Sequence, residues 1–493
     1  MRDPFSIAGK FKPPSQHFDV VVVGAGSAGA AAATRAAKNG DRVLLVDENP
    51  LSPGLIGLDV PLFFGGRATA AVQNKGRMLE QVIAANPLIE AAFEAGVEVM
   101  LGTTVWGAFV NGPGLAALPT PMVGLADDER SWLCGFDRLV VASGARDLVL
   151  SFKGWDQPGV MGANAMHALL TRYHAFAGRS IVILGSGALA LSTALLAIER
   201  GLRVAAIVEV RDRLQGPAHL VERVLAEGVP AYTSHVVAET HGGLDGVERI
   251  LLAPTNDPDA PRVEIACDTI CQAIGLVSAI ELLAVLGAAL MYDPARGGHV
   301  PVIAGSGQTS LPGVSAFGDC AGVAADDPDY GLDWMRALIA ASGPDVIVCQ
   351  CESVSRAALL GVKHPAYLGA VSKGMARRDI ASLREDGPIN QDQVKRLTRT
   401  GMGPCQGRRC REQAAMMLAL STGDRLADIP LASYRAPVRP LPLGVLANAD
   451  EAPEMEAGWD VWFGIPTQWI PYAEIDTDRE ALQLAALSVG EQV

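Results

Sequence analysis

The chain has 493 residues, a formal net charge of −14 and no run of lysine or arginine. Its length predicts about three domains, and its acidic balance argues against nucleic acid as a partner, because binding phosphates requires a basic surface. The first 20 residues contain no apolar segment typical of a secretory signal. Residues 181–198 are uncharged, but they read as a short strand, a glycine turn and a buried helix. We therefore expect no membrane span and a cytoplasmic protein.

Residues 18–48 predict a strand, a glycine turn, an alanine-rich helix and a second strand. Gly24, Gly26 and Gly29 form a G-x-G-x-x-G pattern directly after the first strand. Glycine at these positions permits a tight turn, close approach of the backbone to a pyrophosphate, and close packing of helix on strand. Asp47 ends the second strand, where a carboxylate accepts hydrogen bonds from an adenosine ribose. This pattern predicts a dinucleotide site; the alternative is a glycine-rich turn that binds nothing.

Farther along the chain, residues 97–141 are rich in short strand-like pieces and predict an inserted β-meander. Residues 180–209 then repeat the plan of the first unit, with the pattern Gly185-x-Gly187-x-x-Ala190. Glu209 ends the following strand and favours a free ribose 2′-hydroxyl, so NAD or another adenine nucleotide is favoured over NADP. The alternative is a packing domain whose pocket is empty or repurposed.

Two further segments are predicted as strands. Residues 262–274 read as one strand that carries Cys267 and Cys271; on it the two thiols would share a face but stand about 13 Å apart, too far to bridge. We interpret both as core residues. Residues 311–323 read as a strand that runs into a Gly-Asp turn, and Cys320 in that turn is expected to be a small packing residue.

Four of the eight cysteines form two tight pairs, one C-x-C and one C-x4-C. The four are Cys349, Cys351, Cys405 and Cys410. Four thiolates are the ligand set of a [2Fe–2S] cluster. Zinc sites prefer two-residue spacers within each pair, so zinc is the alternative, followed by unrelated buried thiols. A helix is expected to follow each pair, over residues 352–357 and 411–417, and its N-terminus would stabilise an anionic cluster. Three arginines add positive charge beside the second pair: Arg408, Arg409 and Arg411.

Two later segments carry a resemblance to flavoproteins with two dinucleotide-binding domains. Residues 140–145 (VVASGA) resemble the strand where such chains cross between domains, and residues 317–319 (FGD) resemble their second FAD motif. Carried over by position, the additional FAD residues are Gly144, Gly318 and Asp319. Relatives usually continue with an Ala/Gly-rich helix that faces the flavin ring, whereas here a short acidic segment follows, which leaves contacts to the isoalloxazine ring open.

Three more segments resemble a narrower family. Residues 394–410 (VKRLTRTGMGPCQGRRC) resemble a cluster-binding domain of the bacterioferritin-associated ferredoxin type, and residues 154–161 (GWDQPGVM) and 434–443 (YRAPVRPLPL) extend the match. Together they resemble α subunits of heteromeric amino-acid dehydrogenases and oxidases, such as octopine and nopaline oxidases, hydroxyproline dehydrogenase and a hydrogen cyanide synthase component. The cysteine pairs lie farther apart than in that family, which an insertion around residues 364–390 would explain.

The resemblance implies an α/β fold with two dinucleotide-binding, Rossmann-like domains of the FAD/NAD-linked reductase type and a small helical [2Fe–2S] domain. The expected ranges are 17–155 and 270–345 for the FAD-binding domain, 156–269 for the second nucleotide-binding domain, 346–420 for the cluster domain, and 421–493 for a proline- and tryptophan-containing tail at an interface.

The implied function is an electron-transferring α subunit that holds FAD and a [2Fe–2S] cluster, with NAD or another adenine nucleotide as a further candidate ligand. A flavoprotein β subunit would oxidise a secondary amine or amino acid of opine, sarcosine, proline or hydroxyproline type. A small third subunit and an electron acceptor are further expected partners. We find no general base or substrate clamp in this chain, which fits that division. The alternatives are a stand-alone NADH-dependent reductase of another redox protein, and a scaffold with degenerate nucleotide sites and zinc between the cysteines.

Overall fold

The computed structural model describes residues 13–52, 65–112, 118–257, 260–325, 327–365, 373–447 and 477–488. Its chain divides into two units, Met1–Pro442 and Leu443–Val493. The second unit contains the helices α14 (Leu443–Ala447) and α17 (Asp478–Ser488). The rest of the predicted C-terminal tail, residues 448–476 and 489–493, lies outside the described residues. Among those described, no helix is both long and apolar enough to cross a membrane.

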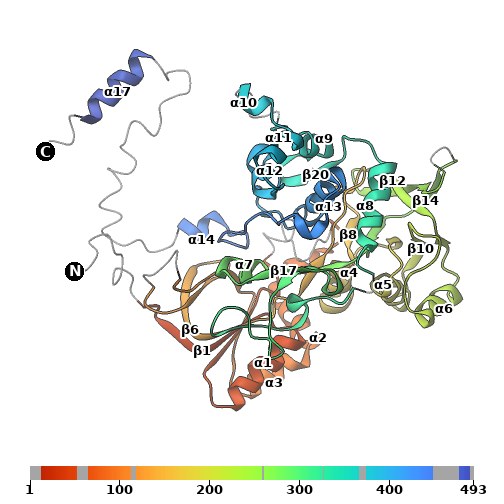
Figure 1. Cartoon of the computed structure of the whole chain (residues 1–493). Coiled ribbons are helices and arrows are strands. Elements are labelled where there is room, and N and C mark those ends of the chain that lie inside the picture. Colours follow the sequence, from red (N-terminus) through yellow and green to blue (C-terminus); the bar gives the residue numbers. More distant parts are fainter. Residues whose placement is uncertain are drawn as a thin grey trace. The chain divides into compact units, whose positions relative to one another are not determined.

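The N-terminal part of the first unit builds a mixed sheet with its first three helices on one face (Figure 1), and leucines of α7 (Glu281–Leu286) pack on the other face. Its elements are β1 (Gln16–Val23), α1 (Ser27–Lys38), β2 (Val43–Asp47), η1 (Ala70–Gln73), α2 (Lys75–Ala85), α3 (Pro87–Glu94), β3 (Glu98–Leu101), β4 (Thr104–Phe109), β5 (Met122–Ala126), β6 (Ser131–Val141) and β7 (Ala145–Asp147). The strand order is β3-β2-β1-β6-β5-β4, and β19 (Val314–Ala316) also pairs with β6. β4, β5 and β6 form the predicted meander, whereas β3 joins the parallel side of the sheet.

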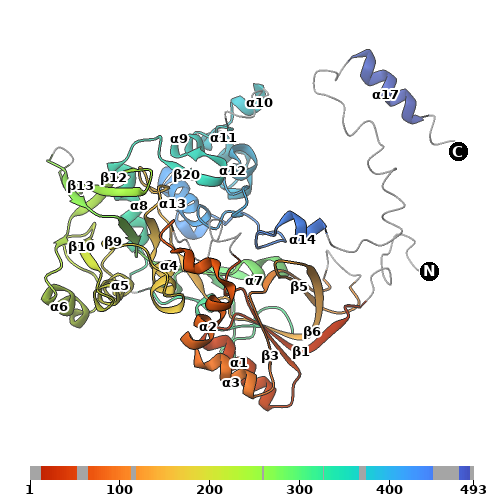
Figure 2. The ribbon, with the colours of Figure 1, turned by 180° about the vertical axis from the view of Figure 1, so that it is seen from behind.

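The second strand–helix–strand repeat forms a parallel sheet of order β11-β10-β9-β15-β8. Figure 2 labels its strands β9 and β10 near the helices α5 and α6. Its region contains β8 (Val160–Gly162), α4 (Ala163–His167), η2 (Ala168–Arg172), β9 (Ser180–Leu184), α5 (Ala188–Glu199), β10 (Arg203–Val208), α6 (Ala218–Ala226), β11 (Ala231–Tyr232), β12 (His235–Gly243), β13 (Gly246–Pro254), β14 (Val263–Ala266) and β15 (Thr269–Gln272). β12, β13 and β14 form a separate antiparallel sheet. Residues 181–198 are thus a buried strand and helix of a nucleotide-binding fold, as predicted.

The prediction of one strand over residues 262–274 is wrong, because β14 and β15 belong to different sheets. The break falls at Asp268, whose carboxylate accepts the backbone N–H groups of Arg179 and Ser180 at 2.8 and 3.2 Å. This side chain draws the chain away from β13 and into the parallel sheet. Cys267 and Cys271 are nevertheless both buried and free, as expected of core residues.

Two short strands carry the chain between the two nucleotide-binding regions. β7 follows the predicted crossover strand and pairs antiparallel with β16 (Leu276–Ser278), where the chain returns. The elements after the return are α7 (Glu281–Leu286), β17 (Leu290–Asp293), η3 (Pro294–Arg296), β18 (Gly298–Pro301), β19, η4 (Gly318–Ala321) and α8 (Tyr330–Ala341). The strand into the Gly-Asp turn is confirmed as β19 followed by η4.

The cysteine-bearing region is mainly helical, as predicted. Its elements are β20 (Ile347–Cys349), η5 (Gln350–Glu352), β21 (Val354–Ser355), α9 (Arg356–Leu360), α10 (Lys373–Ala376), α11 (Ile380–Asp386), α12 (Gln391–Thr398), α13 (Arg411–Thr422) and η7 (Leu426–Asp428). α13 begins directly after Cys410, as expected. The helix after the first pair begins later than predicted, because the left-handed Ser353 (φ +52°) and the strand β21 intervene before Ser355 caps α9.

The cysteine region shares a hydrophobic core with the second nucleotide-binding region. Trp155, in the segment GWDQPGVM, is fully buried in this core, and its indole N–H donates to the Ile347 carbonyl at 2.5 Å. α8 and α13 pack together in the same core. The helices of the cysteine region are therefore held firmly against the nucleotide-binding folds, and the predicted domain boundaries stay predictions.

Candidate functional site

In the turn between β1 and α1, two glycines are packed tightly against other backbone atoms and one faces open space. A Cβ at Gly24 would lie 2.2 Å from the Ala142 carbonyl oxygen, and φ there is +103°. At Gly29 a Cβ would lie 1.8 Å from the Gly24 carbonyl oxygen, whereas Gly26 has nothing within 4 Å. No side chain caps the N-terminus of α1. Free N–H groups at such a terminus suit a phosphate.

Asp47, at the end of β2, is anchored beside this turn. One carboxylate oxygen accepts the backbone N–H of Ala25 at 2.6 Å, and the other accepts the backbone and side-chain N–H groups of Asn49, both at 2.8 Å. The neighbouring Glu48 forms an ion pair with Arg439 at 2.7 Å. Asp47 therefore holds the turn and β2 together while facing the space in front of Gly26.

These residues line a cavity of about 320 Å³, called here the first cavity. The sequence-predicted residues that line it are Gly24, Gly26, Asp47, Gly144 and Asp319. Gly29 and Gly318 instead allow close packing, since a Cβ at Gly318 (φ +70°) would lie 3.0 Å from Ala28 Cβ. Charged residues that the sequence did not assign to this site also line it: Glu48, Arg172, Glu281, Arg408 and Arg439.

The Gly-Asp turn departs from the usual pattern, as the sequence indicated. Asp319 lies in the short 3-10 turn η4, and its carbonyl accepts the Ser278 hydroxyl at 2.7 Å. In the described part of the chain, the next α-helix is α8, which begins only at Tyr330. Cys320 is fully buried, with its sulfur 3.1 Å from the Val141 carbonyl oxygen, so it packs inside as expected.

The second glycine turn repeats the geometry of the first. A Cβ at Gly185 (φ +104°) would lie 2.8 Å from the Ala273 carbonyl oxygen, and Gly187 has nothing within 4 Å. Ala190 is fully buried, in the place of the third glycine. The backbone alone therefore gives no reason to treat the two turns differently.

Glu209, expected to bind a ribose, is instead enclosed by this chain's own groups. It is 0% exposed. One carboxylate oxygen accepts the hydroxyls of Ser186 and Tyr330, the latter at 2.6 Å, and the other accepts the Arg211 N–H at 2.9 Å. Burial raises the pKa of Glu209, and these hydrogen bonds oppose the rise. In turn, the Ser186 N–H donates to the Tyr330 hydroxyl at 2.9 Å, so a side chain of α8 covers the second turn.

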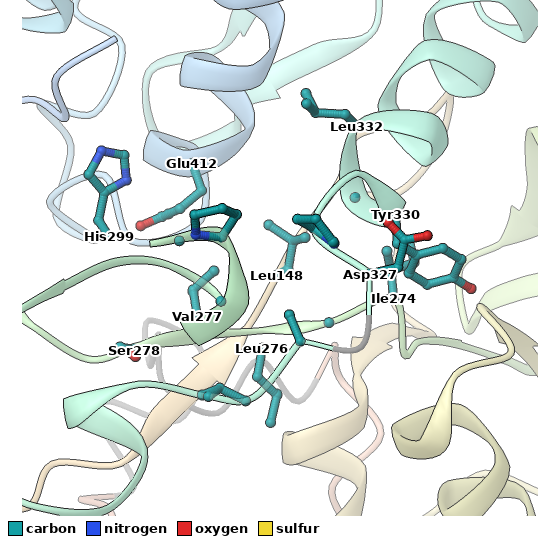
Figure 3. Close-up of a pocket in the computed structure, with 18 of the residues that line it drawn as sticks. Leu148, Ile274, Leu276, Val277, Ser278, His299, Asp327, Tyr330, Leu332 and Glu412 are labelled. Carbon is teal, nitrogen blue, oxygen red and sulfur yellow. The ribbon is translucent and has the colours of Figure 1, made fainter. Parts of the chain in front are cut away.

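A second cavity of about 410 Å³ extends from the second turn to the cysteine region (Figure 3). Gly187 lines it and Glu209 does not. In the close-up, Tyr330 and Asp327 lie at one end and His299 and Glu412 at the other, with Leu148, Leu276 and Val277 between them. Its middle is therefore apolar, and both ends are polar. Leu276 lines both cavities, so β16 forms part of the wall between them.

The four paired cysteines come together in the fold as two contacting pairs. Cys410 hydrogen-bonds to Cys349, and Cys351 hydrogen-bonds to Cys405. Cys349, Cys405 and Cys410 are buried, and Cys351 is partly exposed. Within the described ranges, no three ligand side chains converge on one point as they would around a single metal ion. The arrangement of the sulfurs is therefore that of two neighbouring pairs.

Backbone N–H groups point at one sulfur of each pair. The backbone N–H of Gly401 donates to the Cys349 sulfur at 3.4 Å, and the backbone N–H of Glu352 donates to the same sulfur. The hydrogen bond from Cys351 lowers the pKa of Cys405 to about 5, and N–H groups of Arg409 and Gly407 act in the same direction. The hydrogen bond from Cys410 lowers the pKa of Cys349. Both pairs thus contain a sulfur that the surroundings stabilise as a thiolate.

Two glycine turns of dinucleotide-binding type, the crossover pair β7–β16 and the Gly-Asp turn define a class: oxidoreductases with two dinucleotide-binding domains. Residues 18–343, well over half of the chain, match the family described as pyridine nucleotide-disulphide oxidoreductase. The chain belongs to this family, and this membership supports FAD as its cofactor. Residues 371–450, which include the second cysteine pair, match the family described as sarcosine oxidase A3 domain.

Among individual relatives, the A subunit of opine oxidase from Agrobacterium tumefaciens (strain Ach5) is 25% identical over 476 residues, covering 88% of this chain and 92% of that protein. The alpha subunit of sarcosine oxidase from Rhizobium meliloti (strain 1021) is 25% identical over 521 residues, covering 96% of this chain and 48% of that protein. The chain thus spans about half the length of the latter. The solved structure of L-proline dehydrogenase from P. horikoshii has the same fold, with a TM-score of 0.58, 19% identity, and coverage of 89% of this chain and 81% of that one.

Proposed function

We propose that this chain is the electron-transferring α subunit of a heteromeric flavoprotein dehydrogenase or oxidase that acts on a secondary amine or amino acid. The observation that carries the proposal is the presence, in one compact unit, of a phosphate-type cavity and two contacting pairs of cysteines, three of which are buried. Relatives named as subunits of opine oxidase and sarcosine oxidase support it, and the opine oxidase relative aligns along 92% of its length. The amine would be oxidised on a partner flavoprotein, the β subunit.

FAD is the cofactor that fits the first cavity. The open space at Gly26 and the uncapped N-terminus of α1 suit a diphosphate, and Asp319 and Gly144 line the cavity farther along. We assign Gly24 and Gly29 to the tight turn, Asp47 to the adenosine end, and Gly318 to the packing behind Asp319. Bound FAD would supply the capacity to accept and release electrons, while these residues bind it and orient it.

A [2Fe–2S] cluster of the bacterioferritin-associated ferredoxin type is the group that fits the cysteines. Such a cluster takes two protein ligands on each of its two irons, and the sulfurs lie in two pairs, Cys349 with Cys410 and Cys351 with Cys405. N–H donors to the sulfurs and the N-terminus of α13, which begins directly after Cys410, favour an anionic group there. The cluster would transfer single electrons; the residues around it hold the thiolates and keep three of them buried.

In this proposal the second nucleotide-binding fold has a structural role. Glu209 is taken up by Ser186, Tyr330 and Arg211, so it is not free to accept hydrogen bonds from a ribose. A stand-alone reductase driven by NADH would depend on that acceptor. Gly187 still borders the second cavity, and a smaller adenine nucleotide there would have to bind without Glu209.

The test is an anaerobic titration of the native complex, purified by a tag on this chain. We expect opines, sarcosine, proline or hydroxyproline to bleach the flavin absorbance of the complex, and none of them to bleach the isolated chain. The matched control is the complex carrying Cys405→Ser, which should still accept electrons from the amine but pass them on more slowly. Bleaching of the isolated chain by an amine would contradict the division between subunits, and its bleaching by NADH would favour the reductase.

A further inference from the structure

The loop between the second pair of cysteines reaches into the first cavity. We propose that Arg408, on this loop, binds the diphosphate of FAD, so that the segment from Cys405 to Cys410 is a shared wall of the sulfur site and the flavin site. The inference rests on the proposed function in one respect, namely that FAD occupies the first cavity. It adds a binding residue and a physical link between the two cofactor sites.

Arg408 is buried in the wall of the first cavity. Its side chain is 4% exposed, and it lines the first cavity together with Gly24 and Gly26. The next residue, Arg409, follows a different course, since its guanidinium donates to the Gln350 side-chain oxygen at 2.7 Å. Two adjacent arginines of the same loop therefore contact different parts of the protein, and of the two it is Arg408 that lines the first cavity.

Arg408 has no close carboxylate partner among the ion pairs of the described residues. Its nearest carboxylate is Glu281, with 3.8 Å between Arg408 Nε and Glu281 Oε1, and that same oxygen lies 3.6 Å from Arg146 Nε. Arg146 forms a closer ion pair with Glu412, and Arg439 pairs with Glu48. Arg408 thus shares one distant carboxylate with another buried arginine.

A buried guanidinium costs free energy unless an anion compensates it. A diphosphate in the first cavity would provide the missing negative charge, because guanidinium groups bind phosphate oxygens through paired hydrogen bonds. The uncapped N-terminus of α1 borders the same space and favours the same anion.

Backbone hydrogen bonds hold Arg408 and the two cysteines within one tight loop. The Arg408 N–H donates to the Cys405 carbonyl at 3.2 Å, and the Cys410 N–H donates to the Gly407 carbonyl at 3.2 Å. The Arg408 side chain itself donates to the Cys405 carbonyl at 3.4 Å. The segment is therefore a tight turn in which Arg408 cannot move without the two cysteines. Any coupling that this turn transmits is reciprocal by linkage, so a change in affinity at one site is matched by an equal change at the other.

The experiment measures FAD affinity by quenching of flavin fluorescence on reconstitution of the flavin-free full chain. For Arg408→Gln we expect a rise in Kd of about tenfold, equivalent to about 1.4 kcal/mol, and a weaker dependence of Kd on salt. Arg408→Lys, which keeps the charge, should recover part of the affinity. The control, Arg425→Gln, changes an exposed arginine that pairs with Asp428 away from both sites, and it should bind FAD as the wild type does. ADP and riboflavin, used as separate ligands, assign the contact: Arg408→Gln should weaken ADP and leave riboflavin unchanged.

The coupling is tested by repeating the titration with cluster-free protein, prepared as Cys405→Ser. FAD should bind more weakly to Cys405→Ser than to the wild type, and Arg408→Gln should remove that difference. Wild-type affinity in both Arg408 variants would overturn the inference and leave the proposed function intact, as would a loss confined to riboflavin. Failure of the wild type to bind FAD would overturn the proposed function and this inference together.

Discussion

The two glycine turns of this chain have almost the same backbone and different surroundings. Gly24 and Gly185 both adopt φ near +100° against a facing carbonyl oxygen, and Gly26 and Gly187 are both open. The acidic residue that follows each turn separates them. Asp47 lines a cavity, whereas Glu209 is fully buried and bonded to Ser186 and Tyr330.

This difference shows that a turn motif specifies a fold, and that the side chains around it decide whether a ligand can bind. Tyr330 belongs to α8, far along the chain from the second turn, and its hydroxyl binds both Ser186 and Glu209. At the first turn the distant side chain is Asn86, which donates to the Ala25 carbonyl at 2.7 Å and leaves Asp47 bordering the first cavity together with the arginines of other segments.

The largest effect is expected from an alanine in the first turn. Gly24→Ala would bring a Cβ to 2.2 Å from the Ala142 carbonyl oxygen at a positive φ, so the turn must deform. We expect loss of bound flavin together with destabilisation of several kcal/mol, on the order of other strained core substitutions. Gly185→Ala is the matched variant, with a gap of 2.8 Å to Ala273. It should lower the melting temperature but keep flavin, as measured by flavin content per chain; equal flavin loss in both would contradict the contrast.

The next effect concerns the two acids. Asp47→Asn removes the charge that accepts the Ala25 N–H, and we expect FAD affinity to fall by about tenfold, which corresponds to ~1.4 kcal/mol. Glu209→Gln should leave FAD affinity unchanged and lower stability by about 1–3 kcal/mol, since a buried hydrogen-bonded network is disturbed. Fluorescence titration and thermal unfolding measure the two quantities. A change in FAD affinity for Glu209→Gln would mean that the two folds are coupled through this network.

A weaker signal is expected from NADH. Because Glu209 is not available to a ribose, we predict that NADH binds the isolated chain with a Kd above about 1 mM and leaves the flavin absorbance unchanged. Isothermal calorimetry and an anaerobic absorbance scan measure the two. Tyr330→Phe would remove one hydroxyl from Glu209 and is the variant to compare. Tight binding of NADH to the wild type would show that α8 moves away from the second turn in solution.

The last effect is confined to the pH dependence of stability and comes from β7, the strand that joins the two folds. Burial raises the pKa of Asp147 to about 7 from an ordinary 3.8, although the N–H groups of Asn164 and Ala165 bind the carboxylate. The folded chain therefore holds a proton that the unfolded chain has released. Its contribution to stability is complete below about pH 4 and is lost as the pH rises through about 7.

We accordingly expect the free energy of unfolding to fall between pH 5 and 7, by at most about 1.4 kcal/mol per pH unit for this one proton. Asp147→Asn should flatten that slope. Chemical denaturation at several pH values measures it, and the wild type and the variant should converge in slope above pH 8. The same slope in both proteins would assign the dependence to other groups.

Much of the fold could be predicted from the sequence because its signals are local. The glycine patterns and the apolar strands depend on neighbours in the chain, and the structure has both. Of the predicted crossover strand at residues 140–145, the first two residues end β6 and the last begins β7, with a break between them. The strand break at Asp268 was missed because it depends on a carboxylate that caps the start of β9, nearly 90 residues earlier. The late start of α9 was missed because Ser353 adopts a left-handed conformation that no motif indicates.

The candidate site was less predictable, since it is built from distant contacts. Positive charge was expected near the cysteines, but nothing local indicates that Arg408 lines the first cavity while Arg409 binds Gln350. Likewise, Glu209 ends its strand where a ribose acceptor is expected, and only the packing of α8 takes it out of reach. Such contacts can be read only from the folded chain.

The cofactor content of the purified full chain is the most direct test of the central claim, that the first turn and the four cysteines each hold a redox group. We predict that denaturation releases FAD, and that the protein contains about two irons and two acid-labile sulfides for each flavin. Cys410→Ser should lose the iron and sulfide. Protein that contains zinc without labile sulfide, or that releases no flavin, would contradict the account.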